Sequence, residues 1–543
     1  MNRFSTARLT LTLAATLALA LPALAQEPVD QEAIQFIRTE ATERSRLMEL
    51  ALWMTDVNGP RLTQSPQLDA AQRWAAETFR SWGLEARLEP WGTMGRGWQI
   101  DRFGAMARVE GPQVAAQTFP LFSVPKAWSP GTGRVSAPLV VVDLEDEDGV
   151  AAVRDRLAGA VVLLASSQPV LPGFEPLAVR RTPEQLLELA NSARPRPAGA
   201  PQFSAEAIAR QRAAQVRRNE LFQARPIAVL EASPIGGSGS VRVMGAQPTV
   251  PEGAPLGGRP APWAENAQTV PQIVVLTEQA LRLQRLAAAG QRVTIDLDFE
   301  ATFFPPAPEE NVIAEIRGTD PALADQVVIL GGHFDSWHGG TGATDNAAGS
   351  AVVMEAARLL KAYYDHRGQG PRRTIRFALW SGEEQGLFGS VGYVNQHYAE
   401  GAGFGQPPVA LRPDHARVSA YYNLDNGSGR IRGVYAQSNE AVVPIFRAWL
   451  DALGDETART ITLQNTGGTD HLAFDGVGIP GFQFIQDPLA YFGRTWHGSL
   501  DTYDHLVAED LIQAATVMAV FAHHTAERDA LMPRKPFQLQ ARN

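Results

Sequence analysis

The side chains of this 543-residue sequence that can bind metal ions are concentrated in its second half. All 10 histidines lie between His333 and His524. Because the chain has no cysteine, a metal site can use only His, Asp and Glu side chains, which excludes thiolate zinc sites and iron–sulfur clusters. Metal chemistry that uses histidine is therefore confined to this half of the chain.

A histidine and two aspartates follow the first apolar segment of this half, residues 326–330. Two glycines after that segment lead to His333 and Asp335, an imidazole and a carboxylate two residues apart. Ten residues later, Asp345 precedes a segment with helical periodicity, residues 346–365. Each feature has an ordinary explanation, since His–Asp pairs form hydrogen bonds on many surfaces and Asp often caps a helix.

More carboxylates follow two further apolar segments. Glu383 and Glu384 follow residues 374–380 after a two-residue Ser-Gly step, and Asp425 comes directly after residues 418–424. Two adjacent acids beside a buried strand raise the free energy of the fold unless a cation compensates their charge. A metal ion is the natural partner for such a pair.

Together these loops carry enough ligands for two metal ions. Two imidazoles and three carboxylates would hold two zinc ions if one carboxylate bridges them. The proposed ligands are His333, Asp345, Glu384, Asp425 and His497. Glu383 is outside this set, and a free carboxylate beside metal-activated water suits a general base.

The order and spacing of five motifs resemble those of the co-catalytic dizinc aminopeptidase family that includes carboxypeptidase Q, or plasma glutamate carboxypeptidase. The motifs are His333-Phe-Asp335-Ser, Thr344-Asp345-Asn-Ala-Ala-Gly-Ser350, Trp380-Ser-Gly-Glu383-Glu384-Gln-Gly-Leu-Phe-Gly-Ser390, Asn423-Leu-Asp425 and Trp496-His497-Gly-Ser-Leu-Asp501-Thr502. The resemblance covers residues 310–526. It implies an exopeptidase with two zinc ions per chain that hydrolyses peptide bonds near a free terminus, as an aminopeptidase or a carboxypeptidase Q-like dipeptidase.

The resemblance also implies how the ligands are shared. One zinc ion would be held by His333 and Asp425, the other by Glu384 and His497, and Asp345 would bridge the two. In the same family pattern, Glu383 is the general base, and Asp335 orients His333 as a catalytic supporting residue.

The donor that stabilises the oxyanion is left open by the sequence. Some aminopeptidases of this kind place a tyrosine directly before the zinc histidine, where this chain has Trp496. Tyr491 or His471 could supply the donor instead, and an ordinary packing role is also open for each. The sequence does not choose between them.

Alternating strands and helices must position these loops. The apolar segments at 326–330, 374–380, 418–424 and 481–485 are predicted strands, with a helix at 346–365. This rhythm predicts an α/β fold with a mostly parallel mixed sheet covered by helices on both faces. Ligands collect at the carboxyl ends of the strands in such sheets, where the polar loops fall.

The length of the chain suggests two to four domains. Residues 26–119 are expected to form the N-terminal helical part of the peptidase domain, and residues 301–530 its catalytic part. Residues 120–300, rich in short β segments and in Pro and Gly, predict an inserted β-rich domain, for which the resemblance implies the protease-associated type. Because this insert holds no histidine and no proposed ligand, its removal is expected to impair substrate selection more than zinc binding.

Residues 1–25 predict a signal peptide. Arg3 and Arg8 precede the apolar segment Leu9–Leu21, and Ala23-Leu24-Ala25 is a small-x-small cleavage site. Cleavage is expected after Ala25, which would release the protein into the periplasm or the medium, without a membrane anchor.

Charge limits the partners of the protein. A net charge of -10 provides no positive field for phosphates, so the expected partner is a peptide and not a nucleic acid. A homodimer is left open.

Two other functions use the same fold. One is a glutaminyl cyclase-like acyltransferase, whose relatives generally keep one zinc ion. The other is a receptor-like module without activity, which should have lost ligands.

Overall fold

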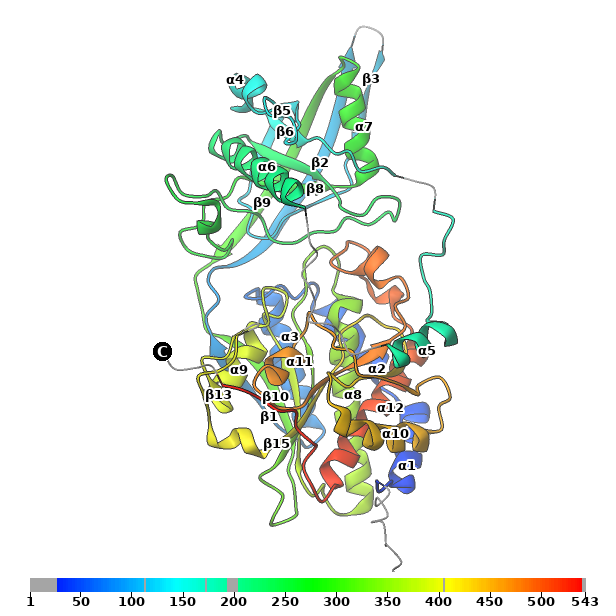
Figure 1. Ribbon diagram of the computed structural model, residues 1–543. Helices are drawn as coiled ribbons and strands as arrows, with labels where there is room; N and C mark the ends of the chain where they lie inside the picture. Colours follow the sequence, from blue (N-terminus) through cyan, green and yellow to red (C-terminus); the bar gives the residue numbers. More distant parts are fainter. Residues whose placement is uncertain (1–26, 112–113, 171–172, 193–203, 404–405, 540–543) are drawn as a thin grey trace, which may run out of the picture.

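The computed structural model describes residues 27–111, 114–170, 173–192, 204–403 and 406–539, and these form two bodies that lie one above the other (Figure 1). Each body contains one eight-stranded sheet. We call the upper body, whose sheet is built from residues 97–304, the insert, because the chain segments on both sides of it belong to the lower or main body. The predicted signal peptide lies outside the described residues.

The sheet of the main body has the strand order β1-β10-β12-β11-β15-β18-β16-β17. Its strands are β1 (Glu85–Gly92), β10 (Glu309–Ile316), β11 (Val327–His333), β12 (Thr374–Trp380), β15 (Val418–Asn423), β16 (Ile431–Tyr435), β17 (Thr460–Thr462) and β18 (Gly481–Gln486). The central strands β12, β11, β15 and β18 are parallel, whereas β1, β10 and β16 join by antiparallel pairing. The predicted mixed, mostly parallel sheet is confirmed.

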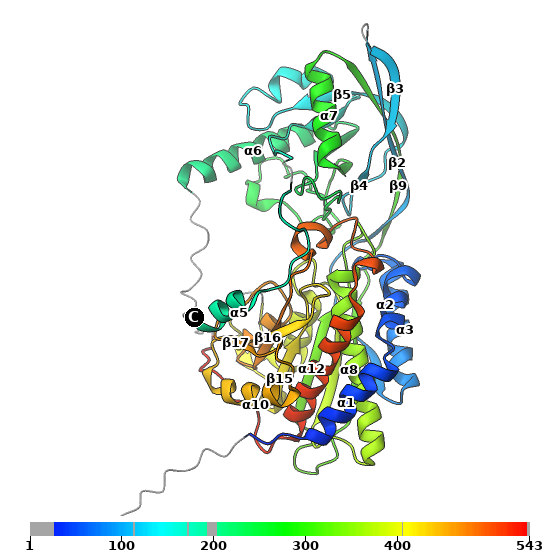
Figure 2. The same ribbon diagram turned by 90° about the vertical axis from the view of Figure 1, so that its right-hand side faces the viewer.

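Helices cover both faces of this sheet, as Figure 2 shows for α1, α8 and α12 on one face. The helices are α1 (Gln31–Arg44), α2 (Leu47–Leu52), α3 (Pro66–Ser81), α8 (Ala348–Arg367), α9 (Phe388–His397), α10 (Val443–Leu453), α11 (His471–Asp475) and α12 (Ala508–Glu527). In β11, Val328 and Leu330 pack into the core beneath α8 and α12, while Ile329 packs on the face of α9 and α11. Alternate residues thus meet different helices, and the strand is apolar throughout because both faces are buried.

The sheet of the insert has the order β3-β2-β9-β5-β6-β7-β8-β4. Its strands are β2 (Gly97–Gly111), β3 (Val114–Pro120), β4 (Ser123–Pro125), β5 (Gly133–Val142), β6 (Val161–Leu164), β7 (Ala228–Ala232), β8 (Gln272–Val275) and β9 (Arg292–Phe304), and its helices are α4 (Arg154–Leu157), α6 (Ala205–Gln223) and α7 (Thr277–Ala288). Residues 97–119, assigned from sequence to the peptidase domain, belong to this sheet, because β2 pairs with β9 from Gly97 onward.

One segment of the insert crosses to the main body. Residues 173–192, which we call the strap, run down beside the main body and end in α5 (Pro183–Asn191), which packs near β17 (Figures 1 and 2). The insert therefore touches the main body at more than the junctions where the chain enters and leaves it.

The N-terminal helix is attached to α12 by a buried polar cluster. Asp30 caps α1, its Oδ1 accepting a hydrogen bond from the Ala33 amide at 2.9 Å. The Asp30 amide donates to Nε2 of His524 at 3.0 Å, and Nδ1 of His524 donates to the Val520 carbonyl at 2.8 Å. His524 is thereby held in its neutral form, and burial lowers its pKa to about 4.

Within the described residues, every helix lacks the combination of length and apolar character that crossing a bilayer requires.

The polar cluster around His524 predicts an acid-sensitive contribution to stability. The unfolded chain takes up a proton at His524 near the ordinary pKa of 6.5, but the folded chain does so only near pH 4, so stability should fall as the pH drops between these values. The loss should reach on the order of 2–3 kcal/mol. In urea unfolding from pH 7 to 4, His524→Gln should lose less stability than the wild type. His366→Gln, at an exposed site on α8, is the control, and parallel curves for all three proteins would contradict the role of His524.

Candidate metal centre and substrate pocket

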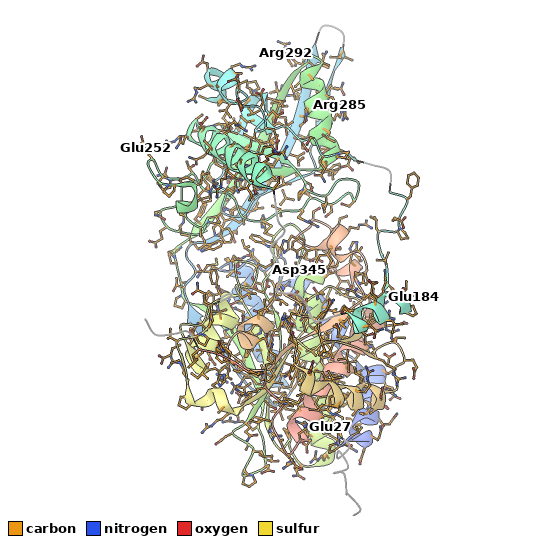
Figure 3. All side chains as sticks on the ribbon, in the orientation of Figure 1. Glu27, Glu184, Glu252, Arg285, Arg292 and Asp345 are labelled. Carbon is orange, nitrogen blue, oxygen red and sulfur yellow. The ribbon has the colours of Figure 1, made fainter. Side chains whose placement is uncertain are left out.

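The five proposed ligand residues meet at the carboxyl ends of the parallel strands. His333 is the last residue of β11, Glu384 follows β12, and Asp425 follows β15. Asp345 lies in the turn before α8, and His497 lies in the loop after β18. Figure 3 shows Asp345 on the side of the main body that faces the insert.

Asp345 does not cap the helix that follows it. The amide of Gly349 in the first turn of α8 donates instead to Oδ1 of Asn346, at 2.9 Å. Oδ1 of Asp345 lies 3.2 Å from Nε2 of His333, and its Oδ2 lies 3.3 Å from Nε2 of His497. The carboxylate therefore stands between the two imidazoles.

Two triads of ligand atoms share this carboxylate. In the first, Nε2 of His333 also lies 3.2 Å from Oδ1 of Asp425. In the second, Nε2 of His497 lies 3.0 Å from Oε2 of Glu384. Within each triad, the possible ligand atoms all lie within 4.8 Å of one another. The structure thus brings all five proposed ligands together, with Asp345 in both groups.

The donor atoms fit metal ions. Nδ1 of His333 faces the carbonyl of Asp335 at 3.0 Å, and because a carbonyl only accepts, Nδ1 carries the hydrogen. In neutral His333 the Nε2 lone pair then faces two carboxylates, an arrangement that a cation between them would stabilise. Oδ2 of Asp345 and Oε1 of Glu384 are buried without a hydrogen-bond partner in the described structure. Imidazole nitrogen and carboxylate oxygen form a donor set that suits zinc.

Burial and neighbouring charges shift the pKa values of the acids in the site. Burial raises the pKa of Glu384 well above its usual value, and the charge of Asp345 adds to the shift. Burial also raises the pKa of Glu383, with Asp425 and Asp470 contributing. For Asp345, burial is outweighed by the hydrogen bond that His333 donates in its protonated form and by the positive charges of both imidazoles when protonated, which together lower its pKa. Cations in the triads would relieve the repulsion among these acids.

A pocket of about 430 Å³ opens beside the triads. Its lining includes Asp345, Glu383, Glu384, Asp425, Tyr491, Phe492, Trp496, His497 and the glycine-rich residues 466–469. The phenol of Tyr491 also helps to lower the pKa of Asp345. Of the two donors that the sequence leaves open, Tyr491 lines this pocket, whereas His471 is fully buried and bonds to the Thr466 carbonyl.

Comparison with known proteins places the second half of the chain in a family. Residues 311–522 match the profile of peptidase family M28. The matched segment contains both triads and Glu383. The chain carries a peptidase family M28 domain.

A curated relative is similar in sequence, and two solved structures are similar in fold. Carboxypeptidase Q of Bos taurus is 29% identical over 272 residues, which are 50% of this chain and 53% of that protein. This chain thus aligns with only about half the length of the curated relatives it matches first. The peptidase M28 precursor of Shewanella amazonensis SB2B has a similar fold, with a TM-score of 0.63, 21% identity and coverage of 93% of this chain and 99% of that one. BSAP, a zinc aminopeptidase of Bacillus subtilis, gives a TM-score of 0.52 at 17% identity, covering 93% and 97%.

Asp335 supports the M28 site in two ways. Its main-chain carbonyl bonds to His333, while its Oδ1 lies 3.6 Å from the same ring nitrogen. The carboxylate instead accepts from the amides of Glu383 and Glu384, at 3.2 and 3.3 Å, and from the hydroxyl of Thr63 at 2.9 Å. Asp335 thus links the loop of one histidine to the loop of the two glutamates.

Asp501 holds the turn that carries Asp345. Its Oδ1 accepts from the amide and the hydroxyl of Thr344 at 2.6 and 2.7 Å, and its Oδ2 accepts from the amide of Asp345 at 3.1 Å. Asp501 belongs to the motif of His497, but its residue type alone predicts no role for it. Its place four residues after His497 in that motif is the signal that marks it.

Arg61 supports the M28 site from the N-terminal segment, for which the sequence predicts helices but no site residue. It is fully buried, and its guanidinium donates to the main-chain carbonyls of Met54, Phe334, Thr341 and Gly342 at 2.7–2.9 Å. Burial lowers its pKa to about 10, so it stays positively charged at neutral pH, near the carboxylates of Asp501 and Asp335. Arg61 therefore fixes the loop between His333 and Asp345 and adds a positive charge behind the acids.

Arg61→Met should both destabilise the fold and loosen the M28 site. Four carbonyls would lose their donor, which should cost about 3–5 kcal/mol in urea unfolding. Hydrogen exchange of residues 336–344 should become faster. Arg373→Met is a matched control, because Arg373 is also fully buried and also bonds to carbonyls, but at the start of β12, away from the site. If both variants altered exchange in residues 336–344 equally, the specific role of Arg61 would be wrong.

Proposed function

We propose that this protein is an exported zinc-dependent exopeptidase with two zinc ions per chain. The observation that carries the proposal is Asp345, whose two oxygens face the histidines of two separate triads. The M28 domain and the fold shared with a zinc aminopeptidase support it. Two complete triads argue against a receptor-like module and against an acyltransferase with a single zinc ion.

The residues around the triads suit peptide hydrolysis. Zinc bound there would lower the pKa of a water molecule and polarise the scissile carbonyl. Glu383 lines the pocket but belongs to neither triad, so its carboxylate is free to accept the proton of the attacking water and return it to the leaving amine. The phenol of Tyr491 is placed to donate a hydrogen bond to the developing oxyanion.

The pocket favours the free amine of a substrate over a free carboxylate. Its charged lining residues are Asp345, Glu383, Glu384 and Asp425, beside His497. Among the described residues that line it there is no Arg or Lys, which a carboxypeptidase would use to bind the terminal carboxylate. We therefore propose an aminopeptidase, whose pocket accepts the free amine of a peptide and, in its described lining, offers no cationic side chain to a terminal carboxylate.

Cellular location and domain type complete the proposal. The signal peptide expected at residues 1–25 would direct the protein to the periplasm or the medium, with cleavage after Ala25. The insert would be a protease-associated-like domain that borders the substrate entrance. Its close contact with the loop of His497 supports this place in the enzyme.

Blocked dipeptides test the aminopeptidase proposal. N-acetylation removes the free amine that an aminopeptidase requires, so it should lower kcat/KM of the zinc-loaded protein by about 10- to 100-fold or more. Amidation of the carboxyl terminus should change kcat/KM by less than about threefold, by the same reasoning. The measurement is hydrolysis of one apolar dipeptide in free, acetylated and amidated form. The opposite ranking would identify a carboxypeptidase, and no hydrolysis of any form would refute the exopeptidase.

The adjacent glutamates should have different roles. Glu383→Gln keeps the size of the side chain but removes its basicity, so kcat should fall by about two to four orders of magnitude with about two zinc ions retained. Glu384→Gln replaces a charged ligand with a poor neutral one, so about one zinc ion should be lost and activity should partly return at high zinc. Elemental analysis and kinetics check both. Loss of zinc from Glu383→Gln, but not from Glu384→Gln, would reverse the assignment.

A further inference from the structure

The loop that carries His497 also carries much of the substrate pocket. This loop, residues 487–499, which we call the His497 loop, contains Tyr491, Phe492 and Trp496, which line the pocket with His497. Unlike His333, whose Nδ1 donates to a carbonyl, His497 has a buried Nδ1 with no hydrogen-bond partner in the described structure. The position of its ring therefore depends on its backbone and on packing.

The insert pairs with the C-terminal end of the His497 loop. The amide of Val243 donates to the carbonyl of His497 at 2.9 Å, and the amide of Ser499 donates to the carbonyl of Val241 at 2.9 Å. The Val241 amide also donates to the hydroxyl of Ser499 at 3.0 Å. These bonds form a short antiparallel bridge centred on Arg242 and Gly498. A backbone carbonyl of the proposed metal ligand is thus bonded directly to the insert.

The strap pairs with the other end of the loop. Val179 and Leu489 exchange two main-chain hydrogen bonds, at 2.9 and 3.2 Å. The next residue, Arg180, forms ion pairs with Asp487 at 3.0 Å and with Asp510 at 2.6 Å. The side chain of Asp487 is fully buried whereas that of Arg180 is 47% exposed, so a partly buried ion pair anchors the strap to the loop.

Arg242 joins the middle of the loop to the insert. Its Nη2 donates to the carbonyl of Phe492 at 2.5 Å, and its guanidinium lies 4.7 Å from the ring centroid of Trp496. The ring of Trp496 in turn lies against His497, with centroids 3.9 Å apart. One side chain of the insert thus contacts two pocket residues, one of which packs on the proposed ligand.

Backbone conformation shows that the loop needs these contacts. Leu489 and His497 have φ values of 44° and 55°, in the left-handed region that residues other than glycine seldom adopt. Each stands where the insert pairs with the loop, and such conformations persist where surrounding contacts determine them. At Gly498 a Cβ would come within 2.4 Å of the Ser240 hydroxyl oxygen and within 2.8 Å of the Arg494 carbonyl oxygen, so the close packing between the loop and the insert favours glycine there.

We propose that the insert helps to position the metal centre. It holds the His497 loop at both ends, and Arg242 is a positioning residue for His497 and the pocket wall. The inference rests on the proposed function in taking His497 as a zinc ligand. The sequence suggests the contrary, since residues 120–300 contain no ligand. The support passes through main-chain bonds and one arginine.

Arg242→Ala tests the proposal, with Arg108→Ala as the matched control. Arg108 also lies in the insert with a half-exposed side chain, but it pairs with Asp296 inside that sheet. In the full-length protein, Arg242→Ala should speed hydrogen exchange of the His497 loop by about tenfold or more. It should also lower the affinity for one of the two zinc ions by about 10- to 100-fold, measured by chelator competition. This is the range for groups that orient metal ligands. Arg108→Ala should change neither measurement.

A second variant acts on the other end of the loop. Arg180→Ala removes both ion pairs of the strap and should speed exchange around Leu489 without touching Trp496. Wild-type exchange and zinc affinity in both variants would overturn the proposal. Faster exchange with unchanged zinc affinity would also overturn it, because the contacts would then serve the fold alone. If the wild type bound no zinc, the proposed function would fail, whereas the exchange data would still decide whether the insert holds the loop.

Discussion

Mutual repulsion among buried carboxylates is the constraint that the residues around the metal centre must satisfy. Asp345, Glu383, Glu384 and Asp425 share one edge of the main sheet because loops after neighbouring parallel strands end there. Acids so close, with little water, retain their charges only if positive charge is nearby. Arg61 supplies one such charge, and the metal ions proposed for the triads would supply the rest. The hydrogen bonds around the site keep these opposing charges in place.

The two triads are supported differently. The ring of His333 is oriented by a carbonyl two residues away, so its support is local to β11. The backbone of His497 is bonded to Val243 in the insert. The M28 domain thus contains every proposed ligand but not every contact that positions them. The segment that the family profile covers therefore includes the proposed ligands, while part of their structural support lies outside it.

Much of the main body could be predicted because local patterns mark it. A continuous apolar run such as β12 indicates a strand buried on both faces, and the polar residues after it lie at the sheet edge. Arg61 could not be found this way, because its partners are main-chain carbonyls, which every sequence provides. The start of the insert at Gly97 is equally unmarked, since the change in composition comes only near residue 120. Contacts through the backbone, as at Val243, leave no trace in residue types.

The two ends of the insert meet as neighbours. Gly97 opens β2 and Phe304 closes β9, and the two residues are direct partners in the sheet. On the main-body side, β1 and β10 pair with each other just before and just after this point. The long excursion of the chain therefore costs the main body little more entropy than a hairpin turn, because the excursion closes itself by its own strand pairing. A segment built in this way can lengthen, shrink or be exchanged during evolution while β1 and β10 remain paired, provided that it still reaches the loop it supports.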